Sequence, residues 1–162
     1  MKDVMIVTGA GQISMAIARR MGYGQKIIMG DKNINNAKAI TEVMNKAGFD
    51  VIPFEMDLAS RESILNMIDE AKKYGPIMML INGAGVSPSQ ASIDMILKVD
   101  LYGTAVLLEE VGKVIEPGGV GVTISSQSGH RMEQLGEYKD RLLAMTPTEE
   151  LLQLDFLQPH QI

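Results

Sequence analysis

The 162-residue sequence contains no cysteine and no tryptophan, and its other aromatic residues are four tyrosines and three phenylalanines. The absence of cysteine excludes disulfide bonds, a cysteine nucleophile and thiolate metal ligands. Thirteen methionines are present. Because methionine fills irregular gaps in apolar cores, we expect methionines to replace aromatic side chains in the interior.

Charge of neither sign dominates: 15 Lys and Arg residues stand against 20 Asp and Glu residues, for a formal net charge of -5. The charges are interspersed, and no basic stripe indicates a nucleic-acid partner. The apolar run at 4–7 is too short for a signal peptide or a membrane span. We therefore expect a cytoplasmic protein without a membrane partner, and we identify no metal-ligating set.

Short apolar runs alternate with segments of helical periodicity. Such runs are typical of strands buried on both faces of a parallel sheet, and their alternation with helices predicts βαβ units with helices on both faces. The predicted fold class is α/β, a Rossmann-type doubly wound parallel sheet of about five strands in the order 3-2-1-4-5. Strands are predicted at 4–7, 26–29, 51–54, 78–81 and 120–124, and helices at 13–21, at 36–47, after Ser60 and at 92–115.

The character of the sequence changes near residue 130. Residues 1–130 carry the alternating pattern, and we assign them to one domain. Residues 131–162 are more polar and only weakly helical, which indicates a helical insertion or extension.

A glycine-rich turn, Gly9-Ala10-Gly11-Gln12-Ile13-Ser14, joins the first predicted strand to the first predicted helix. Such a turn needs one glycine for its backbone angles and another to let a pyrophosphate approach the main chain. The N–H groups at the helix start, at Gln12 and Ile13, then favour phosphate. This context predicts a dinucleotide site and makes residues 1–130 a predicted dinucleotide-binding domain. The absence of Gly-Lys-Ser/Thr excludes a P-loop.

An acidic residue, Asp31, follows the second predicted strand. In a dinucleotide-binding unit, a carboxylate at this place hydrogen-bonds the hydroxyls of the adenosine ribose. Because a 2′-phosphate would meet the same carboxylate, NAD is favoured as the cofactor over NADP. The neighbouring Lys32 argues the other way, since its ammonium group can neutralise a 2′-phosphate.

Further candidate cofactor contacts follow the third and fourth predicted strands, because a doubly wound sheet binds ligands beyond the carboxyl ends of its strands. Asp100 is unusual, since it interrupts the apolar stripe of the helix predicted at 92–115. It is either buried for a specific reason or exposed at the edge of the stripe. The candidate contacts are Asp57, Leu58, Asn82, Gly83, Ala84 and Gly85.

Four segments between residue 3 and about residue 130 resemble motifs of the short-chain dehydrogenase/reductase family. Residues 7–14 resemble its TGxxxGxG turn, one residue shorter and with Ser14 in place of the last glycine. Residues 82–85 are similar to NNAG, residues 100–103 to NLxG with Asp100 in place of asparagine, and residues 124–129 to ISSxxG.

The resemblance implies an oxidoreductase that transfers hydride between a nicotinamide cofactor and a secondary alcohol or ketone. It places Thr8 in the cofactor-binding turn and Asp57 beside the adenine ring. It also implies two catalytic residues: Ser126, which would polarise the carbonyl, and Asp100, which would hold a water molecule of the proton relay.

The YxxxK motif of that family is not found in this sequence. Tyr138 lies near the expected distance after Ser126, but the residue four positions later is Leu142. We therefore expect the chain to stop before the motif and to be inactive by itself, as a truncated oxidoreductase.

Two other functions stay open at this point. The first is a non-catalytic dinucleotide-binding regulatory protein. The second is a methyltransferase, against which the segments at 82–85 and 125–129 argue. By resemblance, the helix predicted at 92–115 is expected to lie at a subunit contact of a homo-oligomer.

Overall fold

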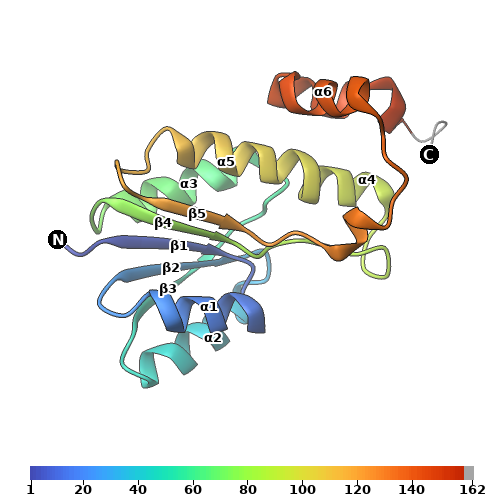
Figure 1. The fold of residues 1–162 in the computed structure, drawn as a ribbon. Coiled ribbons are helices and arrows are strands. Elements are labelled where there is room, and N and C mark those ends of the chain that lie inside the picture. The colour runs from blue at the N-terminus through green and yellow to red at the C-terminus, as the bar shows by residue number, and fades with distance from the viewer. Residues whose placement is uncertain (159–162) are drawn as a thin grey trace.

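The computed structural model describes residues 1–158 as a parallel sheet with helices on both faces (Figure 1). All strand pairs are parallel, and the strand order β3-β2-β1-β4-β5 confirms the predicted fold class and topology. The strands are β1 (Val4–Thr8), β2 (Lys26–Asp31), β3 (Asp50–Glu55), β4 (Ile77–Asn82) and β5 (Val120–Thr123).

Two helices cover one face of the sheet, and the other face carries a third helix and a long segmented one (Figure 1). Within residues 1–158, no helix combines the length and the apolar content needed to cross a bilayer. The first face carries α1 (Gln12–Met21) and α2 (Ile34–Lys46), and the second carries α3 (Arg61–Lys72), α4 (Ile93–Ile96), a π-helical segment (Leu97–Gly103) and α5 (Thr104–Gly112).

The central strand β1 has every side chain buried, and successive residues enter different halves of the core. Val4 and Ile6 pack on the side of α3 and α5, whereas Met5 and Val7 pack on the side of α1 and α2. This follows from the two-residue period of a strand. Methionine contributes to both halves, as expected; the fully buried methionines include Met5, Met29, Met44, Met56 and Met67.

Polar side chains define where the helices start. Ser60 caps α3 as predicted, and its hydroxyl accepts the Ser63 N–H at 3.2 Å. Helix α2 begins two residues earlier than predicted, because the Asn33 side chain accepts the Asn35 N–H at 3.0 Å. An asparagine side chain at this position satisfies a backbone donor that the helix itself leaves free.

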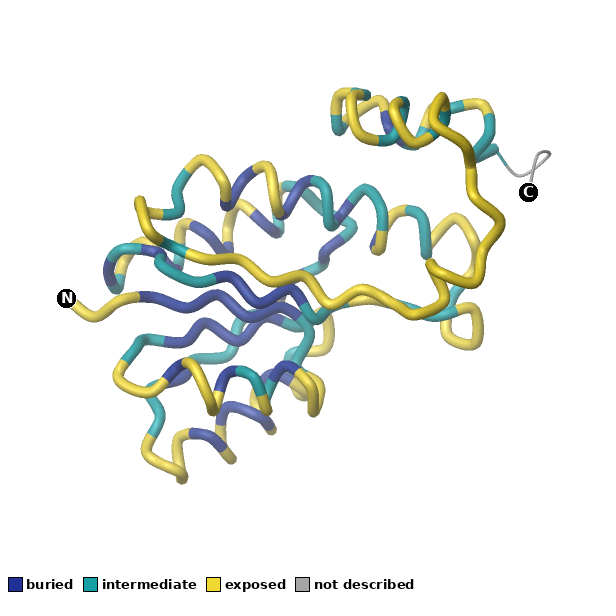
Figure 2. The backbone as a smooth tube through the Cα atoms, in the orientation of Figure 1, coloured by how far each residue is buried: buried dark blue, intermediate teal, exposed yellow. Residues whose placement is uncertain are grey.

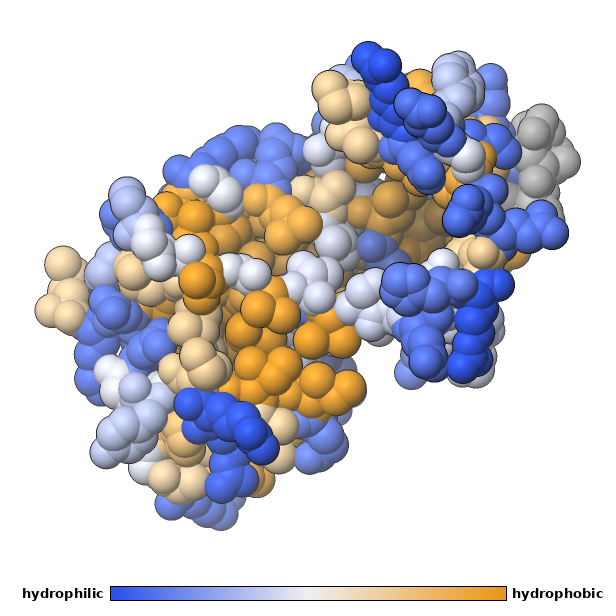
Figure 3. All heavy atoms as spheres, viewed as in Figure 1, coloured by the Kyte–Doolittle hydropathy of each residue, from blue (hydrophilic) through white to orange (hydrophobic). Residues whose placement is uncertain are grey.

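Strand β5 is exposed along its whole length (Figure 2). Its residues Val120 and Val122 pair with Met79 and Ile81 of β4, so they point toward the face that carries α1. Their exposed fractions are 52% and 48%, and Figure 3 shows apolar side chains gathered over β5 and α1. The strand lies where it was predicted, but the burial expected of such a run is absent.

Residues 127–158 form short helices, of which the later ones lie beside the long segmented helix (Figure 1). Leu151 is buried in this arrangement. Residues 159–162, the end of the extension predicted from 131 onward, lie outside the described part of the chain. The elements are 3-10 helices at Gln127–His130, Thr148–Gln153 and Asp155–Leu157, together with α6 (Glu137–Met145).

Arg61, the first residue of α3, ties residues 148–157 to the rest of the protein. Its guanidinium group pairs with Glu149 at 2.6 Å, with Glu109 at 3.3 Å and with Glu110. The Tyr102 hydroxyl also donates to Glu149, at 3.0 Å. Hydrogen bonding from Thr148, together with the nearby cations, lowers the pKa of Glu109 to about 2, so its carboxylate stays charged at neutral and mildly acidic pH.

Replacing Arg61 with methionine should therefore release residues 148–157. Because these pairs are partly exposed, we expect them to contribute about 1 kcal/mol. Their loss should raise the population of the opened form, and with it the observed cleavage rate, roughly fivefold. Limited trypsin digestion after Lys139 and Arg141, followed by mass spectrometry, measures this. The matched control is Lys113→Met, which removes a cation from Glu109 and Glu110. Equal cleavage rates for the two variants would contradict this role of Arg61.

Candidate functional site

A cleft of about 350 Å³ lies beyond the carboxyl ends of the central strands. Small-molecule sites fall in this size range, and in doubly wound sheets they lie where the strand order reverses, here between β1 and β4. The cleft is lined by Gly9, Ala10, Gly11, Asp31, Lys32, Asn36, Met56, Asp57, Leu58, Gly83, Ala84, Gly85, Val86, Gln90 and Val99.

The two glycines of the turn after β1 are required for different reasons. Gly9 has φ +78°, and a Cβ atom there would lie 2.7 Å from the backbone of Ala84. This residue must therefore be glycine both for its backbone angle and for the close approach of the loop after β4. At Gly11 a Cβ atom would meet nothing within 4 Å, so that side of the turn is open to a ligand.

Gly11 is also the N-cap of α1, and no side chain caps the backbone donors at this end of the helix. Free N–H groups and the positive end of the helix dipole together favour an anion. A pyrophosphate lying along Gly11 would meet no side chain of the turn and would face these donors. The residues present therefore fit the phosphate part of a dinucleotide.

Asp31 holds the glycine turn in place. Its Oδ2 atom accepts the Ala10 N–H at 2.8 Å, and its Oδ1 atom accepts the Asn33 N–H at 2.8 Å. An ionised carboxylate offers about four acceptor positions, so two remain for further donors. A ribose diol supplies two hydroxyl donors, and the half-buried Asp31 side chain is suited to accept them.

Lys32 and Asp57 form an ion pair of 3.0 Å across the rim of the cleft, between the ends of β2 and β3. Burial opposes the ionisation of Asp57, but Lys32 and the Ala59 N–H outweigh it and hold the pKa of this carboxyl below its usual value. The Lys32 ammonium group therefore already has an anionic partner in the protein.

Buried polar contacts support the cleft from below. The Thr8 hydroxyl donates to Asn82 Oδ1 at 2.6 Å and thereby joins the ends of β1 and β4. Ser14 is buried on α1, and a Cβ atom at Gly83 would lie 2.2 Å from its hydroxyl oxygen. Ser14 can replace the last glycine of the turn because its neighbour on β4's loop has no side chain.

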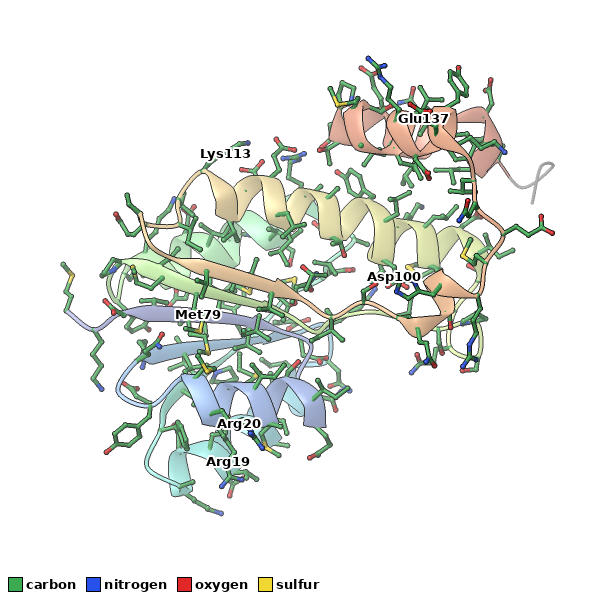
Figure 4. The ribbon with its side chains drawn as sticks, viewed as in Figure 1. Arg19, Arg20, Met79, Asp100, Lys113 and Glu137 are labelled. Carbon is green, nitrogen blue, oxygen red and sulfur yellow. The ribbon has the colours of Figure 1, made fainter. Side chains whose placement is uncertain are left out.

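Asp100 is exposed, which resolves the two alternatives left open by the sequence in favour of exposure. It lies on the long helix (Figure 4), in its π-helical segment. Its Oδ1 atom accepts the N–H of Val86 at 3.0 Å. Asp100 thus contacts the loop after β4, although its own side chain is not among the residues that line the cleft.

Ser126 and Tyr138 are both exposed and lie outside the cleft lining. The Ser126 hydroxyl accepts the Ser128 N–H at 3.1 Å and caps the short helix Gln127–His130. Tyr138 lies on α6 with an exposed fraction of 76%. Ser126 thus has a capping contact, while its segment runs beside β4, where the Ile124 N–H donates to the Asn82 carbonyl at 2.9 Å.

The cleft brings together most of the predicted cofactor residues. Thr8, Gln12, Ile13 and Asn82 do not line it. Among the cleft residues not predicted from sequence, Asn36 follows the early start of α2, and Val86 and Gln90 belong to the loop after β4. Within residues 1–158, no group of three or more histidine or acidic side chains is placed to hold a metal ion. The predicted residues that line the cleft are Gly9, Gly11, Asp31, Lys32, Asp57, Leu58, Gly83, Ala84 and Gly85.

Comparison with known proteins gives a family and several relatives. The family model described as short chain dehydrogenase matches residues 3–138. A short-chain dehydrogenase/reductase, bsc3, from Alternaria brassicicola is 34% identical over 133 residues, which cover 82% of this chain and 48% of that protein. Human carbonyl reductase [NADPH] 3 is 26% identical, with 76% and 48% covered. The chain thus spans about half the length of these curated relatives.

Solved structures agree with this result. A putative short-chain dehydrogenase/reductase from Burkholderia xenovorans superposes with a TM-score of 0.68 at 27% identity, covering 80% of this chain and 58% of that one. A short chain dehydrogenase from Mycobacterium smegmatis superposes with a TM-score of 0.72 at 22% identity, covering 88% and 66%; at that identity the likeness concerns the fold alone.

Proposed function

The chain belongs to the short-chain dehydrogenase family, and from that premise we propose that it binds NAD as part of an oxidoreductase acting on secondary alcohols or ketones. The observation that carries the proposal is the cleft itself, in which the open glycine turn and Asp31 lie together. A bound nicotinamide would supply the hydride chemistry. The residues of this chain would bind and orient the adenosine and pyrophosphate parts.

The choice of NAD over NADP rests on the surroundings of Asp31. Its two remaining acceptor positions suit hydroxyl donors, whereas a 2′-phosphate would bring a second anion against the carboxylate. Lys32 could offset that repulsion only by leaving Asp57, its partner at 3.0 Å. NADP is the alternative, and the carbonyl reductases among the relatives carry NADPH in their names.

Calorimetric titration with both cofactors tests this preference. We expect the chain to bind NAD at least about tenfold more tightly than NADP, since each lost or repelled charged hydrogen bond is worth about 1.5–3 kcal/mol. Asp31→Ala should weaken NAD binding and bring the two affinities together. The ratio of the NAD and NADP affinities is the informative quantity, because loss of the Asp31 contact with Ala10 weakens the binding of both cofactors alike.

Lys32→Ala is the matched control for this experiment, and the preference for NAD should survive it. If the unmodified chain bound NADP as tightly as NAD, and Lys32→Ala removed that binding, recognition of a 2′-phosphate by Lys32 would replace the proposal.

A second candidate function is a non-catalytic dinucleotide-binding regulator. The exposed positions of Ser126 and Tyr138 outside the cleft favour it. In both cases residues 1–130 would bind the nucleotide, and residues 131–162 would be a helical extension.

We also propose a homo-oligomer that associates through the long helix, next to the part that residues 148–157 contact. Light scattering at micromolar concentration tests this, and a monomer would contradict it.

A further inference from the structure

The loop after β4 contains a short turn that is closed by hydrogen bonds between Ser87 and Gln90. The Ser87 carbonyl accepts the N–H groups of Gln90 and Ala91, at 2.8 and 3.0 Å. In return, the Gln90 side chain folds back over the turn, and its Oε1 atom accepts both the N–H and the hydroxyl of Ser87, each at 3.0 Å. Gln90 also lines the cleft, so the turn is part of the cleft wall.

These contacts fix the orientation of the Gln90 amide. The backbone N–H of Ser87 can only donate, so it must face the amide oxygen and not the amide nitrogen. The oxygen has two lone pairs, and Ser87 occupies both of them. The hydrogen bonds within residues 1–158 leave the two N–H donors of Nε2 free. Gln90 therefore offers the cleft donors and no acceptor.

Four other residues that line the cleft are apolar and belong to one half of the core. Leu58 and Val99 are buried members of the core cluster on the side of α3 and α5, and the half-buried Ala84 and Val86 pack against that cluster. All four line the cleft, and Val86 directly precedes the turn that carries Gln90. The cleft therefore has an apolar part with an amide donor on its wall.

Of the parts of a dinucleotide, the base suits this apolar part best. The open glycine turn and Asp31 already offer partners to the pyrophosphate and the ribose. Proteins hold a base between apolar side chains and form hydrogen bonds to its polar edge. The edge of adenine presents ring nitrogens, which accept, and one amino group, which donates. Because Gln90 Oε1 is occupied, it cannot accept from the amino group, and a ring nitrogen is the group that Nε2 can bind.

We propose that Gln90 is a further base-binding residue of this cleft, whose side-chain amide donates a hydrogen bond to a ring nitrogen of adenine. This proposal rests on the proposed function, because the base is that of the cofactor. Ser87 is then a positioning residue, since it holds the amide oxygen and thereby directs Nε2. The contribution of Gln90 is separate from those of Asp31 and the glycine turn.

Three adenine-containing ligands test the assignment: NADH and ADP-ribose by calorimetry, and adenosine by ligand-observed NMR. Gln90→Ala should weaken the binding of all three by the same factor, roughly fivefold or more, since one hydrogen bond is lost. Gln90→Glu keeps an acceptor for Ser87 but has no donor, so it should weaken binding at least as much. Because Gln90 is an exposed loop residue, both variants should keep the urea-unfolding midpoint of the unmodified chain.

Ser89→Ala is the matched control. Its hydroxyl lies 2.8 Å from that of Ser87 in the same turn, but Ser89 does not line the cleft, and the three affinities should stay within about twofold. Ser87→Ala removes one of the two donors to Gln90 Oε1, so its effect should fall between those of Ser89→Ala and Gln90→Ala. In the Gln90→Ala background it should have no further effect on adenosine binding.

Unchanged affinities in Gln90→Ala, or unimpaired binding by Gln90→Glu, would overturn the assignment. A loss confined to NADH would place Gln90 at the nicotinamide end, and a loss shared by NADH and ADP-ribose but absent for adenosine would place it at a phosphate. Either result contradicts base binding. Failure of the unmodified chain to bind any of the three ligands would contradict the proposed function as well, whereas binding that is insensitive to Gln90 would contradict this inference alone.

Discussion

Incubation of the 162-residue chain with NAD and a panel of secondary alcohols is expected to form no detectable NADH. A positioned acid or base is typically worth about 10²- to 10⁴-fold in rate, and misplacement of reacting groups can cost about 10²-fold more. Among the described residues, no tyrosine lines the cleft, and Lys32 is the one lysine that does. Tyr138 is exposed on α6, and Leu142 stands where a partner lysine would be needed.

The absorbance of NADH measures this result, and calorimetry on the same sample verifies that NAD is bound. Ser126→Ala is the matched variant. Turnover by the unmodified chain that disappears in Ser126→Ala would refute the prediction. It would show that Ser126 reaches the substrate in solution and that Tyr138 or another group acts as the acid and base.

Gly9→Ala and Gly11→Ala make the same chemical change two positions apart in one turn, yet their expected effects differ strongly. Alanine at Gly9 must adopt φ +78° and place Cβ 2.7 Å from the Ala84 backbone. The backbone angle alone costs about 1–2 kcal/mol, and the contact adds to it. We expect Gly9→Ala to lose about 2–4 kcal/mol of unfolding free energy and all measurable cofactor binding.

At Gly11 the added methyl group meets no neighbour, so the free energy of unfolding of Gly11→Ala should lie within about 0.5 kcal/mol of that of the unmodified chain. Its methyl group enters the open side of the turn, so it should weaken cofactor binding without weakening the fold. Urea unfolding and calorimetry on both variants separate the two effects. Equal destabilisation by both substitutions would contradict the different roles assigned to the two glycines.

The features that could be predicted from the sequence are those with a local pattern. Short apolar runs predicted the positions of all five strands, and Ser60 marked the start of α3 because its hydroxyl accepts a backbone N–H three residues away. The exposure of β5 could not be predicted in this way. Burial depends on which elements flank a strand, and the apolar pattern at 120–124 does not distinguish an edge strand from a central one.

The candidate site also has features that a local pattern predicts and features that it does not. Glycine spacing and the position of Asp31 identified the cleft. The contact of Asp31 with Ala10 depends on how two distant loops approach each other, and nothing local signals it. The spacing of the apolar residues does not indicate the π-helical segment either. Asp100 was recognisable in the sequence as an interruption of the apolar stripe, but its contact with Val86 is evident only from the three-dimensional structure.

The strand order also has a consequence for the folding pathway. β1 pairs with β2, the next strand along the chain, and with β4, which follows only after two more helices. Closing the longer loop costs more chain entropy, and non-local pairings generally form more slowly. Since the cleft lies between β1 and β4, its two sides meet only when this late pairing forms. Acquisition of nucleotide affinity during refolding would therefore follow formation of the β1–β2–β3 half and mark completion of the sheet.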